Sequence, residues 1–125
     1  MEVWPTTDAL TMAKTVRETL WQHKGERVII MDMREITLIA DYFVIASANN
    51  PTQVSALADH TEAAMAKMGA TRLNPGRRNQ AHWILMDYGT IVVHIFTEDE
   101  RQYYNLERFW GDADIIPDIP RSKEA

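Results

Sequence analysis

Residues 83–96 read WILMDYGTIVVHIF, and this stretch says most about how the chain folds. Two apolar runs of strand length, Trp83–Asp87 and Thr90–Phe96, flank the pair Tyr88-Gly89, which suits a tight turn. The pattern therefore predicts a β-hairpin. Asp87 and His94 are polar residues set among its large apolar ones, where a plain core would not place them, and they indicate a surface that acts on something.

A helix is predicted directly after the hairpin, over residues 98–110. Thr97-x-x-Glu100 matches a capping box at its start, and Gly111 follows as a stop signal. The acidic run Glu98-Asp99-Glu100 suits the positive end of the helix dipole, and a second role in meeting a basic partner stays open. At helical spacing Tyr103, Leu106 and Trp110 share one stripe, with Tyr104 at its edge. Core packing explains half or more of these aromatics, and any that is left exposed would suit an interface anchor.

The chain before the hairpin predicts two helices and two strands. A helix is expected over residues 7–23, capped by Thr6 or Thr7 and ended by Gly25. Strands are expected over 27–33 and 41–47, and the second is apolar enough to be covered on both faces.

The second of those helices is expected over residues 51–68. Asn50 is a good N-cap, Pro51 suits the first helical position, and Gln53 can reach back to the cap. Its apolar residues form one stripe: Val54, Leu57, Ala58, Thr61, Met65 and Met68.

The remaining segments are short. Residues 36–38 look like a connector, 70–73 like a short strand, and 74–80 like an exposed polar loop. The segment after Gly111 carries Ile115, Ile116 and Ile119, which suit packing on the body of the protein or on a partner. We predict an α/β fold in which a mixed sheet of four to five strands packs against helices. The expected division is a single domain over 1–112 and a C-terminal tail over 113–125.

Composition limits the class of function. The 125 residues contain no cysteine, which excludes disulfides, thiol nucleophiles and cysteine-based zinc sites. No apolar run is long enough to span a membrane and the first residues do not read as a signal peptide, so a cytoplasmic protein is expected. The net charge of −5 disfavours nucleic acid as the primary partner and suits a basic protein. Arg72, Arg77 and Arg78 are the candidates for a local basic patch.

Catalytic chemistry is not expected. The four histidines are dispersed, and the five glycines form no phosphate-binding motif. Small α/β folds of this element order include nucleotidyltransferases, which bind metal through paired carboxylates after a Gly-Ser turn. Here no such pair follows Ser47, and Asp32 has no carboxylate two residues away. Asp87 and His94 could form an acid–base pair across the hairpin. The favoured interpretation is structural: Asp87 shapes the turn and His94 bonds to a neighbour. We therefore expect no catalytic residue, metal or cofactor.

Several short motifs together resemble one known family, the ribosomal silencing factors or Iojap-like proteins. The resemblance covers about residues 28–110. It rests on Asp41-Tyr42-Phe43-Val44-Ile45, Gln53-Val54, Trp83, Asp87-Tyr88-Gly89, Val92-Val93-His94, Arg101, Tyr104-x-Leu106-Glu107 and Trp110. The sequence departs from the family pattern at Ala40, Ser47-Ala48, Pro75 and Thr90; at Thr90 an acidic residue is usual.

The resemblance implies a nucleotidyltransferase-like fold without the catalytic carboxylates. It also implies binding to large-subunit ribosomal protein fourteen, a block on joining of the small subunit, repression of translation, and a homodimer when the protein is off the ribosome. The alternative is a metal-dependent nucleotide-handling enzyme of the same fold. The residues expected to bind the partner come from the hairpin and the following helix: Trp83, Asp87, Tyr88, His94, Phe96, Arg101, Tyr104, Leu106 and Trp110.

Overall fold

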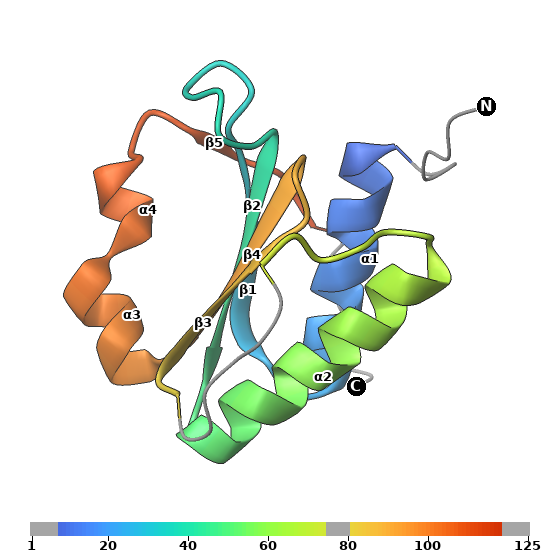
Figure 1. The fold of residues 1–125 in the computed structure, drawn as a ribbon. Coiled ribbons are helices and arrows are strands. Elements are labelled where there is room, and N and C mark those ends of the chain that lie inside the picture. The colour runs from blue at the N-terminus through green and yellow to red at the C-terminus, as the bar shows by residue number, and fades with distance from the viewer. Residues whose placement is uncertain (1–7, 75–80, 119–125) are drawn as a thin grey trace.

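The computed structural model describes residues 8–74 and 81–118. In these ranges the chain forms a five-stranded sheet with the strand order β3-β4-β2-β1-β5. The strands are β1 (Glu26–Asp32), β2 (Tyr42–Ala48), β3 (Trp83–Asp87), β4 (Ile91–Thr97) and β5 (Asp114–Ile115). Helices α1 (Ala9–Gln22) and α2 (Pro51–Lys67) cover one face, and α3 (Glu98–Tyr104) and α4 (Leu106–Phe109) cover the other (Figure 1).

The sheet is mixed, as the sequence predicts. The central strands β2 and β4 run parallel, and the β1–β2, β3–β4 and β1–β5 pairs are antiparallel. Every residue of β2 and β4 is buried, because both strands carry helices on both sides. The predicted α/β class with a mixed sheet and packed helices is confirmed.

The first helical layer follows the sequence signals closely. Asn50 caps α2 by accepting a hydrogen bond from the Gln53 backbone N–H at 2.8 Å, and the predicted apolar stripe of α2 faces the sheet. The start predicted for α1 is wrong by two residues. Its cap is Asp8, whose side chain accepts from the Thr11 N–H at 2.8 Å, and the first helical residue is Ala9.

The second helical layer corrects a prediction. The single helix expected over residues 98–110 is broken at Asn105, which adopts the left-handed conformation with φ of 45°. Asparagine tolerates this conformation, and the Asn105 side chain caps α4 by accepting from the Arg108 N–H at 3.3 Å. Thr97 is the N-cap of α3, but its side chain makes no capping bond, so the predicted capping box is not formed.

Two further segments differ from expectation. Residues 70–73 form no strand, although the Leu73 N–H donates to the Asp87 carbonyl at 2.7 Å beside β3. The segment after Gly111 contributes β5, which pairs with β1 through Met31↔Ile115 and Asp32↔Asp114. The boundary drawn at residue 112 therefore lies just before a strand of the sheet. Ile119 lies outside the described residues.

None of the helices in ranges 8–74 and 81–118 is long and apolar enough to cross a membrane.

Candidate functional site

The β3–β4 hairpin presents alternate residues to the sheet face that carries α3 and α4. The pairs Trp83↔Phe96, Leu85↔His94 and Asp87↔Val92 lie opposite each other in register, and alternation in a strand places all six side chains on that face. Ile84, Met86, Val93 and Ile95 point the other way and join the core under α1 and α2.

Aromatic rings meet on this side of the sheet. Trp83 lies 5.0 Å from Phe96 and 4.7 Å from Tyr104, measured between ring centroids. Phe43 on β2 continues the contact, with its ring centroid 4.8 Å from that of His94 and 6.1 Å from that of Trp110. We call this set the aromatic face: Phe43, Trp83, His94, Phe96, Tyr104 and Trp110.

The predicted partner-binding residues divide by exposure. Tyr104 is exposed over 44% of its surface, and Trp83, Asp87, Tyr88, Leu106 and Trp110 are half-buried. Phe96, His94 and Arg101 are buried. A partner can touch the first group directly. The buried three can shape the surface from below, and their predicted contact with a partner stays a prediction.

Tyr88 belongs to a different part of the molecule. It packs against the core under α1 and α2, and burial raises the pKa of its phenol to about 12. Its hydroxyl therefore stays protonated at neutral pH. The structure thus separates Tyr88 from the aromatic face.

His94 is a neutral histidine in an apolar setting. Its Nδ1 accepts a hydrogen bond from Trp83 Nε1–H at 3.3 Å. Burial lowers its pKa to about 4, because charging the ring would remove a cation from water without an anion to receive it. The sequence predicts that His94 bonds to a neighbouring residue, and the structure shows that this residue is Trp83.

Asp87 shapes the hairpin turn, as its structural interpretation predicts. One carboxylate oxygen accepts from the Gly89 N–H at 2.8 Å, and Gly89 has φ of 86°, a conformation that suits glycine. The hydrogen bonds of the two side chains go to Gly89 and Trp83, so the geometry does not join Asp87 and His94 into an acid–base pair.

Arg101 fastens the second helical layer to the sheet. Its guanidinium donates to the Arg27 carbonyl at 2.7 Å, to Ser47 Oγ at 2.9 Å and to Glu107 Oε2 at 2.7 Å. These bonds tie α3 to β1, β2 and α4. They satisfy the guanidinium inside the protein, where Arg101 is only 2% exposed. The Arg27 carbonyl is available because β1 has an irregular register there and Arg27 takes φ of 49°.

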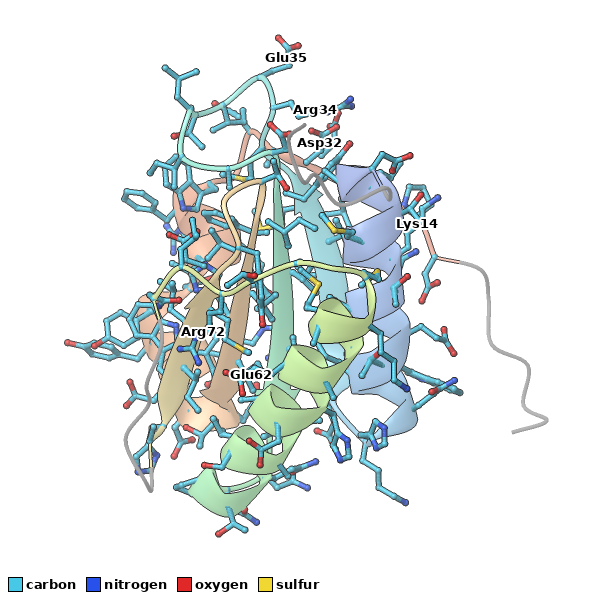
Figure 2. All side chains as sticks on the ribbon, turned by 45° about the vertical axis from the view of Figure 1, so that its right-hand side comes forward. Lys14, Asp32, Arg34, Glu35, Glu62 and Arg72 are labelled. Atoms are coloured by element: carbon cyan, nitrogen blue, oxygen red, sulfur yellow. The ribbon has the colours of Figure 1, made fainter. Side chains whose placement is uncertain are left out.

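The outer edge of β3 is covered by polar side chains. Asn74 donates to the Leu85 carbonyl at 2.8 Å and accepts from the Asp87 N–H at 2.8 Å, so an amide side chain takes the place of a paired strand. Figure 2 shows Arg72 directed toward Glu62 on α2, and their charged groups lie 3.0 Å apart. The charge of Arg72, one candidate for a local basic patch, is thus offset by Glu62. Arg77 and Arg78 lie outside the described residues.

The residues considered for nucleotidyl transfer have other partners. Ser47 is buried and accepts from Arg101, and Asp32 pairs with Arg34 at 2.8 Å (Figure 2). Hydrogen bonds from Arg34 hold the pKa of the Asp32 carboxyl below its usual range. Within residues 8–74 and 81–118, no group of three or more His, Asp or Glu side chains is arranged to hold a metal ion.

Comparison with known families decides what this chain is. Residues 6–125 match the sequence model described as "Ribosomal silencing factor during starvation". The chain belongs to the ribosomal silencing factor family.

Relatives and solved structures agree with the family assignment. The ribosomal silencing factors of Halalkalibacterium halodurans and Bacillus subtilis are 42% and 40% identical to this chain, each over 74% of it and over 80% and 78% of their own lengths. A crystal structure of a Chromobacterium violaceum protein superposes with a TM-score of 0.79 at 25% identity, covering 94% of this chain and 93% of that one. The resemblance read from the motifs is confirmed.

Sequence reasoning missed part of the exposed surface of this silencing-factor chain. Tyr103 is 79% exposed and Phe109 is 73% exposed, so the predicted stripe of Tyr103, Leu106 and Trp110 is wrong for Tyr103. Leu106 and Trp110 pack toward the sheet, whereas the break at Asn105 leaves Tyr103 outside. An open depression of about 500 Å³ lies on this outer side, lined by Gln102, Tyr103, Tyr104, Asn105, Arg108 and Phe109. The signal that could have revealed it is Asn105, a residue prone to the left-handed conformation.

Proposed function

We propose that this chain binds the large ribosomal subunit through large-subunit ribosomal protein fourteen, blocks joining of the small subunit and represses translation when nutrients are scarce. The observation that carries the proposal is the partly exposed pair Tyr104–Trp83 on a member of the silencing-factor family. The hairpin and the end of α3 would form the docking surface. The role is that of a binding protein, and it assigns no catalytic residue.

The surface has the features of a protein interface. Tyr104 packs against Trp83 and leaves 44% of its area in solvent, so a partner can bury a ring that is already held in place. The first turn of α3 carries Glu98, Asp99 and Glu100 close by in sequence. An acidic rim raises the rate of encounter with a basic ribosomal protein, while the aromatic anchor slows dissociation.

The experiment is cosedimentation of variants with isolated large subunits. Truncating an aromatic anchor typically costs about 2–4 kcal/mol, so Tyr104→Ala is expected to weaken binding about thirtyfold to a thousandfold. Trp21→Ala is the matched control, because Trp21 is an aromatic residue exposed to nearly the same degree, 43%, and it lies on α1 at the other face of the sheet (Figure 1). Circular dichroism checks that both variants fold. Parent-like binding by folded Tyr104→Ala would remove Tyr104 as an anchor, and loss of binding only in Trp21→Ala would move the surface to the side of the sheet that carries α1.

We also propose that the chain is a homodimer when off the ribosome, using part of the same surface. The support is the apolar area that the described chain leaves in solvent near the aromatic face, including Leu85, Tyr104 and Phe109. Light scattering at tens of micromolar protein is expected to give twice the monomer mass. A monomer at that concentration contradicts the proposal.

A further inference from the structure

One buried polar atom of the aromatic face lacks a hydrogen-bond partner. Within the described residues, Nε2 of His94 is the buried side-chain nitrogen or oxygen that has no hydrogen-bond partner. His94 is 4% exposed, so bulk water does not satisfy the atom either. Native proteins pair nearly all such groups, because a buried polar atom without a partner loses its bonds to water and gains none in return. An unpaired one therefore asks for an explanation.

The hydrogen bond at the other ring nitrogen fixes the chemistry of this atom. The indole Nε1–H of Trp83 is only a donor, so His94 Nδ1 must accept and carries no proton. Burial lowers the pKa of His94 to about 4, so the ring is neutral near pH 7 and holds a single N–H. That proton is on Nε2. The unpaired atom is thus a hydrogen-bond donor, and what it lacks is an acceptor.

Two polar groups that stand on the same side of the sheet bond to Arg101 and not to His94. Ser47 Oγ and Glu107 Oε2 both accept from Arg101. The rings closest to His94 belong to Phe43, Phe96 and Trp83, which offer no oxygen.

His94 neighbours the residues that leave the aromatic face partly open. Leu85, its cross-strand partner, is 38% exposed, and Tyr104, which lies over Trp83, is 44% exposed. By contrast, the large apolar side chains of the core under α1 and α2 are closed to solvent. Nε2 is covered in the free chain, so a ligand atom can reach it only if a neighbouring side chain moves. Leu85 and Tyr104 each have solvent on one side to move into.

We propose that His94 Nε2–H is a specificity-determining donor for the docked ribosomal protein. In the complex it donates a hydrogen bond to an oxygen of that protein, a main-chain carbonyl or a carboxylate. The inference rests on the proposed function and adds to it the chemistry of one contact. It explains why a buried histidine stands where a phenylalanine or leucine would fill the space without an unpaired group. A partner surface that offers an acceptor at this position gains a hydrogen bond, whereas one that offers an apolar group gains none and one that offers a donor is repelled, so the contact favours the first kind.

Two substitutions test the roles of His94 Nδ1 and Nε2 separately. In His94→Asn, the amide oxygen can take the place of Nδ1 and keep the bond from Trp83, but nothing reaches the position of Nε2. In His94→Gln, the longer side chain can place its amide N–H where Nε2–H stands and gives up the bond to Trp83. We expect His94→Asn to bind large subunits about tenfold more weakly than the parent, and His94→Gln to stay within about threefold of it. Circular dichroism and melting curves confirm that each variant folds.

Nitrogen-15 NMR of histidine-labelled parent protein gives a second readout that needs no variant. In the free chain the His94 signals are expected to show the Nε2–H tautomer. On addition of isolated ribosomal protein fourteen, the Nε2 signal is expected to shift while the Nδ1 signal stays in place.

The outcomes are distinct. Parent-like binding by folded His94→Asn overturns the inference, and so does a larger loss in His94→Gln than in His94→Asn. A free chain in the Nδ1–H tautomer, or an Nε2 signal that does not respond to bound partner, overturns it even if both variants fail to fold. If the parent itself does not bind large subunits or the ribosomal protein, the proposed function fails and the inference falls with it.

Discussion

The two faces of the sheet are built on different principles. Under α1 and α2 the contacts are mainly aliphatic. Two polar residues are buried in these helices: Thr61 bonds within its own helix to the Leu57 carbonyl at 2.9 Å, and Arg17 donates to the Ile116 carbonyl at 3.1 Å, at the end of the sheet. Under α3 and α4 the sheet carries aromatic rings together with the buried polar side chains of Arg101, Ser47 and His94. The first face is closed, whereas the second leaves Leu85 and Tyr104 partly in solvent.

This difference shows how one small sheet can serve stability and recognition at once. Aliphatic burial is non-directional and supplies most of the folding free energy. A face that has to remain partly open cannot rely on burial, so directional bonds such as those of Arg101 hold its helices in place. We therefore expect substitutions on the closed face to change stability alone, and substitutions on the open face to change binding as well.

The largest expected effect is on the closed face. Leu57 of α2 is fully buried. Leu57→Ala should lower the free energy of unfolding by about 3–4 kcal/mol, because it removes buried methyl groups and leaves a cavity. Urea denaturation measures the loss. The fraction of variant that remains folded should bind large subunits as the parent does, and weaker binding by the folded fraction would break the proposed division between the faces.

A smaller loss of stability, joined to a loss of binding, is expected at Arg101. Arg101→Met keeps the unbranched apolar part of the side chain but leaves Ser47 and two carbonyls without their donor and Glu107 without its cation. We expect a cost of about 2–3 kcal/mol in unfolding, less than for a fully buried pair because Glu107 is partly exposed. Binding should weaken too, since Tyr104 lies on the helix that Arg101 holds.

Arg27→Met is the control for that variant. Arg27 of β1 pairs with Glu98, which lies on α3 as Arg101 does. Both side chains are partly in solvent, with 52% and 40% exposed. Such a pair contributes about 0–1 kcal/mol, so the control should stay near the parent in both assays. Equal losses in the two variants would mean that general charge, and not the buried bonds, holds α3.

The smallest of the three effects depends on pH. The pKa of His94 falls from 6.5 to about 4 on folding, so between these values the unfolded chain binds the proton and the folded chain does not. Stability from this group is therefore complete above pH 6.5 and is lost as the pH falls toward 4. From pH 7.5 to pH 5 the loss should be about 2 kcal/mol.

His94→Gln removes that titration. Urea denaturation at both pH values should show a smaller decrease for His94→Gln than for the parent. Equal decreases in the two proteins would mean that the His94 pKa is not depressed by folding.

Much of the architecture could be predicted because its signals are local. Asn50 and Pro51 mark the start of α2 within four residues of one another, and the alternation in residues 83–96 gives the hairpin and its register. The motifs also indicated the family, and the surface residue Tyr104 came out exposed.

The features that sequence reasoning missed depend on distant contacts. The break at Asn105 is accompanied by the Arg101 bond to Arg27, 74 positions away, and no local pattern encodes that bond. Strand β5 is only two residues long, and it exists because Met31 and Asp32 offer it an edge. The burial of His94 likewise depends on Phe43, a residue of another strand.

The pairing of β5 with β1 has a consequence for synthesis of the chain. Strand β1 is synthesised before the other strands, and its outer edge is covered only when β5 has been synthesised, because residues 114–115 pair with residues 31–32. Until then β1 exposes an open edge of backbone groups, and such edges template pairing with other chains. Arg17 of α1 also holds the residue after β5 in place, by donating to the Ile116 carbonyl at 3.1 Å. We therefore expect a nascent or shortened chain that stops before Asp114 to leave β1 open to self-association, which residues 114–115 prevent in the folded chain by covering that edge.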